Sequence, residues 1–146
     1  MALKIIVFTT CGSRKEAGRI ARVLVDRRLA ACVNILESLV ESVYRWKGRV
    51  DTAKEFLLII KSTRARFAAL RDKILELHSY DVPEIIATSI TAASDEYLAW
   101  LTESVRSEKK HPRRRQTFRL RRGPDRDRQS GLRYLQFPPI NGSSRP

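Results

Sequence analysis

Phe56-Leu57-Leu58-Ile59-Ile60 is the stretch on which the fold of this chain depends. It lies in a segment from Arg49 to Lys61 that reads as one strand, but it does not alternate between apolar and polar residues. Successive side chains of a strand point to opposite faces of a sheet, so this strand needs cover on both faces. Lys47-Gly48 provides the turn of a hairpin whose first arm runs from Ala31 to Trp46, with an interruption near Glu37-Ser38.

The segments on either side of this hairpin predict further strands and helices. Leu3 to Cys11 is apolar and β-branched, which is typical of a strand. Ser13 with Glu16 three residues later is a capping-box pattern and predicts a helix to about Arg28. The other expected elements are, in chain order, a helix over Thr63 to Leu77, a strand over Glu84 to Thr91 and a short helix after Ser94.

The order β-α-β-β-α-β with an extra C-terminal helix predicts an α+β fold, the ferredoxin-like sandwich. In that architecture both crossover helices cover one face of a four-stranded antiparallel sheet, and the other face is bare in a monomer. Because the strand with Phe56–Ile60 needs cover on both faces, we expect another subunit to cover the second face.

Charge divides the chain near Arg106. Residues 107–146 hold 12 Lys/Arg against 3 Asp/Glu, whereas residues 1–106 hold 17 against 13. The last segment also contains five of the six prolines, and no helical or strand period is sustained in it. We therefore predict a folded domain over residues 1–106 and a mostly disordered basic tail over residues 107–146, in which the patch Tyr134-Leu135-Gln136-Phe137 is the exception.

Several classes of protein are disfavoured by the sequence. It has no apolar run of roughly eighteen residues, the length of a membrane span, and no signal-peptide pattern. We therefore expect a cytoplasmic protein in which Cys11 and Cys32 stay thiols, Cys32 as a small core residue. No GxGxxG or P-loop motif is present, and no Ser/His/Asp set is suggested, so an enzyme is not expected.

The stretch His78-Ser79-Tyr80-Asp81-Val82-Pro83-Glu84 holds an imidazole, a phenol and two carboxylates on a backbone stiffened by proline. His78 is a candidate metal ligand, and the alternative is a histidine stabilised by a helix C-terminus. Cys11 precedes the capped helix, whose N-terminus should lower the thiol pKa. A thiolate with an imidazole suits copper or zinc, and the alternative for Cys11 is a half-buried thiol without a role.

Three motifs together resemble the CutA family, the divalent-cation tolerance proteins, over about Lys4 to Arg106. They are Ala30-Ala31-Cys32-Val33-Asn34-Ile35, Tyr44-Arg45-Trp46-Lys47-Gly48 and the LHSYDVPE stretch of residues 77–84. The resemblance implies a homotrimer around a three-fold axis. It also implies that this trimer binds divalent cations, among which copper is the leading candidate, without catalytic turnover.

The resemblance also implies site residues. The family's copper is associated with a thiol of the first-strand region and the histidine of the LHPYDVPE-like motif, which implies Cys11 and His78 here. The family's thiol position itself corresponds to Thr9, and Cys11 lies two residues along on the same strand face. An inter-subunit ligand cleft is expected to include Trp46, Lys61, Tyr80, Asp81 and Glu84, with a Lys61–Glu84 ion pair as the structural alternative.

Three other functions are kept as alternatives. A small-molecule sensor would hold its ligand between subunits. A nucleic-acid binder would use the arginine-rich tail, since such tails bind phosphate through charge. An enzyme would use Cys11 as nucleophile, but no base is placed beside it in the sequence.

Overall fold

The computed structural model describes residues 3–108. The chain divides into two units, Met1–Lys110 and His111–Pro146, and each is treated by itself. All predictions about residues 109–146 therefore lie outside the described residues. These are the disordered basic tail, the patch Tyr134-Leu135-Gln136-Phe137 and nucleic-acid binding through the tail.

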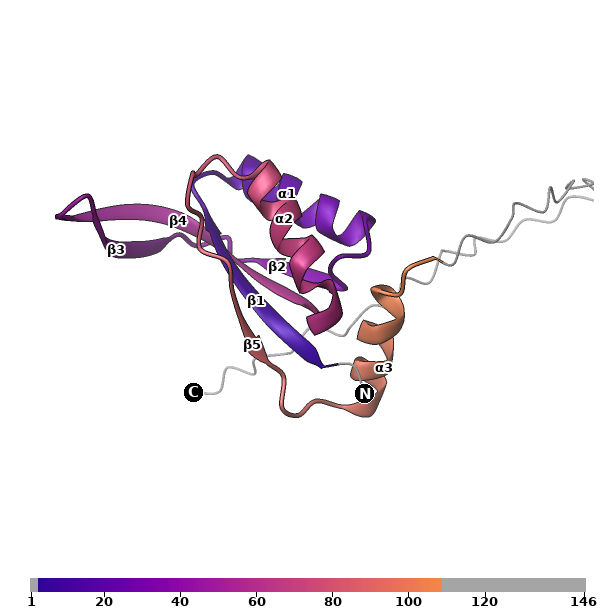
Figure 1. Cartoon of the computed structure of the whole chain (residues 1–146). Coiled ribbons are helices and arrows are strands. Elements are labelled where there is room, and N and C mark those ends of the chain that lie inside the picture. Colours follow the sequence, from indigo (N-terminus) through magenta and orange to yellow (C-terminus); the bar gives the residue numbers. More distant parts are fainter. Residues whose placement is uncertain (1–2, 109–146) are drawn as a thin grey trace, which may run out of the picture. The chain divides into compact units, whose positions relative to one another are not determined.

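The described unit contains an antiparallel sheet and three α-helices (Figure 1). Their order is β1 (Lys4–Cys11), α1 (Arg14–Asp26), β2 (Cys32–Ile35), β3 (Val40–Trp46), β4 (Arg49–Thr63), the 3-10 turn η1 (Arg64–Arg66), α2 (Phe67–Leu77), β5 (Ile86–Ser89) and α3 (Asp95–Ser104).

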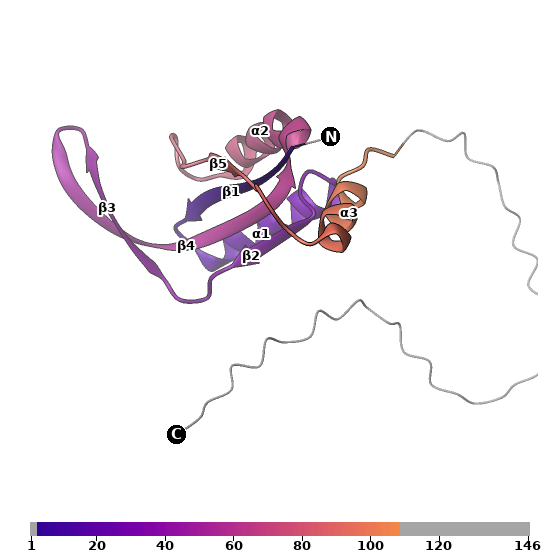
Figure 2. The same cartoon turned by 90° about the horizontal axis from the view of Figure 1, so that it is seen from below.

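The sheet has the strand order β2-β4-β1-β5, and β3 pairs with the outer part of β4. All of the pairings are antiparallel. Helices α1 and α2 lie side by side on one face of this sheet, whereas α3 lies at its end (Figures 1 and 2). The predicted α+β class is confirmed. None of the helices of residues 3–108 combines the length and apolar content that crossing a bilayer requires.

The β3–β4 hairpin follows the sequence closely. Its turn residues Lys47 and Gly48 have φ of 47° and 77°, the two positive values that a tight hairpin turn of the primed type needs. The predicted interruption is present, because β2 ends at Ile35 and β3 begins at Val40. Since β4 is 15 residues long, the hairpin projects beyond the body of the sheet (Figure 1).

The predicted helices and the last strand are present, but some of their predicted boundaries are wrong. Ser13 caps α1, and its Oγ accepts a hydrogen bond from the Glu16 N–H at 3.2 Å. The predicted start of the second helix at Thr63 is wrong, because Thr63 pairs with Lys4 in the β1–β4 ladder. The strand predicted over Glu84 to Thr91 is shorter, because only Ile86–Ser89 pairs with β1.

Strand β4 has two apolar faces, as its sequence requires. Leu58 and Ile60 are fully buried in a core that α1 and α2 cover. The alternate residues Leu57 and Ile59 point to the other face and are only half-buried. The register places more apolar residues beside them, and we call the set the open face: Ile6, Phe8, Leu57, Ile59 and Ile86.

The closed core can be distinguished from a solvent-exposed position by two single leucine substitutions. Leu58→Ala should lower the free energy of unfolding by about 2–5 kcal/mol, because it leaves a cavity in a closed core. The matched control is Leu75→Ala on α2, where the leucine is 47% exposed and the change should cost less than about 1 kcal/mol. Urea unfolding at one protein concentration measures both, and equal costs would contradict this assignment of the core.

Candidate functional site

Cys11, Glu16 and His78 meet at one end of the sheet, although His78 is far from the other two in sequence. Cys11 ends β1, Glu16 lies in the first turn of α1, and His78 directly follows α2. Their sulfur, carboxylate and ring-nitrogen atoms all lie within 4.8 Å of one another. Within residues 3–108 this is the one set of three potential metal-ligating side chains that converges so closely, and we call it the triad.

The imidazole of His78 is completely buried, and both of its nitrogens have partners. The Tyr80 N–H donates to Nδ1 at 3.0 Å, and Nε2 lies 2.7 Å from the carbonyl oxygen of Thr10. Because Nδ1 accepts, the proton belongs on Nε2, which donates to Thr10. The histidine thus joins the end of β1 to the loop that follows α2.

Glu16 connects the first turn of α1 to the same loop. Its Oε1 accepts from the Ser79 N–H at 2.8 Å, and its Oε2 accepts from the Ser79 hydroxyl at 2.8 Å. Oε1 also lies 3.3 Å from Nδ1 of His78. Sequence reasoning identified Glu16 only as a capping residue, because its contact with Ser79 depends on how α1 and α2 pack.

The Cys11 thiol is fully buried. Burial raises its pKa to about 12, and the carboxylates of Glu16 and Glu55 add to the shift. The expectation that the helix N-terminus lowers this pKa is therefore wrong, since desolvation and two nearby carboxylates outweigh the helix amides. At neutral pH Cys11 is a protonated thiol.

Thr9 occupies the position that the resemblance assigns to the family's thiol. It lies on the same strand face as Cys11 and is fully buried. Its hydroxyl has no hydrogen-bond partner within the described part of the chain. The strand face that leads to the triad therefore holds a second buried polar group.

A second feature is a cavity of about 810 Å³ between the β3–β4 hairpin and the loop after α2, which we call the cleft. Four of the five residues predicted for a ligand cleft line it: Trp46, Tyr80, Asp81 and Glu84. The other lining residues are Thr10, Ser42, Val43, Tyr44, Arg45, Glu55, Ser79 and Val82.

Lys61 does not line this cleft within the described chain. The register puts Lys61 opposite Ile6 and Cys32, whereas the cleft begins at Thr10 near the other end of β1. Its Nζ donates to the Cys32 Sγ at 3.9 Å. No Lys61–Glu84 ion pair occurs among residues 3–108. Lys61 lies opposite Ile6, whereas Glu84 precedes Ile86, which lies opposite Phe8 toward the other end of β1.

Glu55 and Tyr80 lie next to each other in the lining of the cleft. Glu55 is only 6% exposed. Burial and a hydrogen bond to Glu55 raise the pKa of Tyr80 to about 12, so the phenol keeps its proton. A Cβ atom on Gly12 would lie 3.0 Å from the Tyr80 hydroxyl, so the glycine leaves room for this ring. Glu55 was missed because the sequence shows only an acid beside an apolar strand.

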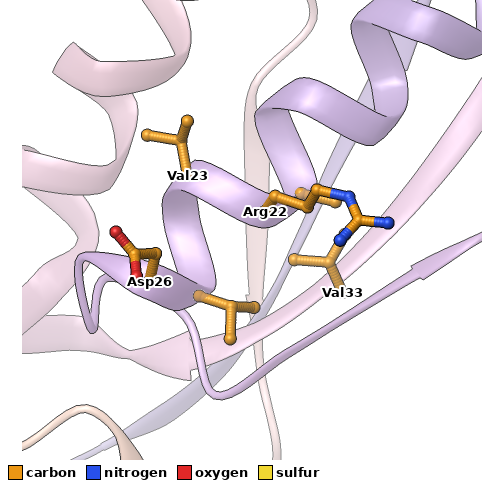
Figure 3. A pocket seen from close by; sticks show the side chains of 6 residues that line it. Arg22, Val23, Asp26 and Val33 are labelled. Carbon is orange, nitrogen blue, oxygen red and sulfur yellow. The ribbon is translucent and has the colours of Figure 1, made fainter.

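A further groove of about 630 Å³ lies along α1 and the edge strand β2 (Figure 3). Its lining is mostly aliphatic, with one acid and one base: Ala21, Arg22, Val23, Val25, Asp26 and Val33. It contains none of the predicted site residues. The triad and the cleft are therefore the two candidate sites.

Comparison with known proteins gives one consistent family. A profile described as "CutA1 divalent ion tolerance protein" matches residues 5–104. The chain is 46% identical over 99 residues to the "Divalent-cation tolerance protein CutA" of Thermus thermophilus, covering 68% of this chain and 95% of that protein. It is 44% identical over 103 residues to "Protein CutA, chloroplastic" of Arabidopsis thaliana, with 70% of this chain matched. It spans only 56% of the length of that plant relative.

Solved structures give the same result. The divalent cation tolerance protein of Thermus thermophilus superimposes with a TM-score of 0.68 at 44% identity, over 69% of this chain and 97% of that one. CutA1 from Oryza sativa superimposes with a TM-score of 0.69 at 41% identity, over 71% of this chain and 94% of that one.

The state of Cys11 can be tested by alkylation. Treatment of the native protein with iodoacetamide at pH 8 should leave Cys11 unmodified, because it is buried and protonated. In urea it should react fully, and peptide mass spectrometry distinguishes it from the half-buried Cys32. Reaction of Cys11 in the native protein as fast as in urea would contradict the buried thiol.

Proposed function

Because the chain belongs to the CutA1 divalent ion tolerance family, we propose that it is a non-catalytic homotrimer that binds copper at the triad. The observation that carries the metal assignment is the convergence of three donor types, a thiol, a carboxylate and an imidazole, within 4.8 Å. A thiolate with an imidazole suits copper and zinc better than magnesium or calcium.

The triad must rearrange to bind an ion. Cys11 has to lose its proton, and His78 has to release either Thr10 or the Tyr80 N–H. Each of these steps costs free energy, so the affinity should be modest and should fall at low pH. Glu16 already lies next to both groups and supplies a negative charge to the bound ion.

The open face supports the trimer. The sheet order β2-β4-β1-β5 with both crossover helices on one face fits the ferredoxin-like arrangement, which leaves the opposite face for a partner. Ile86 is 54% exposed there, next to Phe8 in the register. Apolar side chains gathered on one sheet face favour burial against another copy of the chain. Closed cyclic symmetry then gives an oligomer of defined size instead of an open-ended assembly.

We place the protein in the cytoplasm on its sequence alone. One relative is named as a chloroplastic protein and another as a periplasmic one, so membership of the family does not fix the compartment.

The trimer predicts a mass in light scattering of three times 16.8 kDa, about 50 kDa. Ile86→Glu should shift the protein to smaller species, because a charge would be buried without a partner at the interface. The matched control is Val25→Glu on α1, where the valine is 43% exposed on the helix side and the trimer should persist. A monomeric wild type at micromolar concentration would disprove the assembly.

The metal assignment predicts selective losses of affinity. Cys11→Ser and His78→Gln should each weaken Cu(II) and Zn(II) binding by at least about tenfold. The matched controls are Cys32→Ser and His111→Ala, which should stay within about twofold. Isothermal titration at pH 8 and pH 6 measures all five proteins, and binding should weaken at the lower pH. Equal binding by the wild type and the four variants would exclude the triad as the metal site.

A further inference from the structure

The cleft has a chemistry of its own. It adjoins the triad, but no triad side chain lines it, and its walls are partly open to solvent. The hairpin contributes Tyr44 and Trp46, which are 40% and 48% exposed. The loop after α2 contributes Tyr80, Asp81 and Glu84. A volume of about 810 Å³ is large enough for an organic molecule.

The cleft is acidic in a strongly basic protein. Its lining contains three carboxylates, those of Glu55, Asp81 and Glu84, and one cation, Arg45. The Arg45 guanidinium lies 3.5 Å from the Gly48 carbonyl oxygen at the tip of the hairpin. The whole chain has a net charge of +13. The excess of carboxylates in the lining therefore favours a cationic ligand over an anionic one.

The three carboxylates do not form a metal site. Within residues 3–108 the triad is the one set whose ligand atoms converge, and the acids of the cleft do not form such a set. A small ion needs its oxygen ligands within about 2.0–2.6 Å of itself, which dispersed carboxylates cannot offer. A ligand whose positive charges are also dispersed matches this arrangement.

The aromatic residues of the lining favour an organic cation over a metal ion. The electron-rich faces of tryptophan and tyrosine attract ammonium groups, and their apolar area covers methylene chains. Tyr80 is held in place by its hydrogen bond to Glu55 and by the His78 ring, whose centroid lies 4.8 Å away. One wall is therefore fixed before a ligand binds, which lowers the entropy lost on binding.

From these observations we propose that the cleft binds a linear organic polycation of the aliphatic di- or polyamine class. The ammonium groups pair with Asp81 and Glu84, and the rings of Tyr44, Trp46 and Tyr80 cover the carbon chain. The nearly buried Glu55 adds a further negative charge to the lining. The proposal uses no residue of the metal-binding triad as a ligand and does not depend on the metal assignment.

Isothermal titration of the full chain with spermidine at constant ionic strength tests the proposal. The wild type should bind spermidine, and the double variant Asp81→Asn, Glu84→Gln should lose at least about tenfold in affinity. The matched control is Asp72→Asn, Glu76→Gln, which removes the same charge from exposed positions of α2 and should stay within about twofold. Trp46→Leu, which keeps every charge, should weaken binding by about three- to tenfold.

Three results would overturn the proposal. The first is the absence of any heat of binding with millimolar spermidine. The second is a loss of spermidine affinity in the α2 control equal to that in the cleft variant, which would mean that overall charge attracts spermidine without a specific site. The third is displacement of spermidine by Mg²⁺ at equal concentration, which would indicate a metal site. Light scattering and Cu(II) titration of the same variants should match the wild type, so failure here is distinguishable from failure of the proposed trimer or triad.

Discussion

The antiparallel ladder between β1 and β4 is the constraint on which the rest of the structure depends. It runs from Lys4 opposite Thr63 to Cys11 opposite Phe56. Because side chains alternate along a strand, this single register decides which apolar residues enter the helix-covered core and which remain on the open face. A slip of one residue would exchange the two sets and remove Cys11 from the buried face.

The triad holds together the elements that this ladder brings near one another. Through hydrogen bonds, His78 and Glu16 join the last residues of β1, the first turn of α1 and the loop after α2. Buried polar groups are costly unless they are paired, and here the pairing fixes the path of that loop. The side chains that we propose as metal ligands therefore also maintain the local fold, and binding an ion there would require some of these hydrogen bonds to break.

The loop after α2 serves both candidate sites. His78 points inward to the triad, whereas Tyr80, Asp81 and Glu84 line the cleft. The two are joined directly, because the Tyr80 backbone N–H is the partner of the His78 Nδ1. A proline in this loop restricts the backbone, so the inward and outward residues are held in a fixed relation.

Local patterns in the sequence were enough to predict much of this protein. The Ser13 cap, the Lys47-Gly48 turn and the doubly apolar Phe56–Ile60 strand are determined by near neighbours, so the α+β class followed from them, and the ordered motifs indicated the family. What only the tertiary structure decided concerns residues far apart in the chain. The Cys11 thiol has a raised pKa because packing buries it beside Glu16 and Glu55, although its position before a helix suggested the opposite. Lys61 lies away from the cleft, and Glu55 is hydrogen-bonded to Tyr80. Strand register and loop packing decide both placements, and no short stretch of sequence encodes either one.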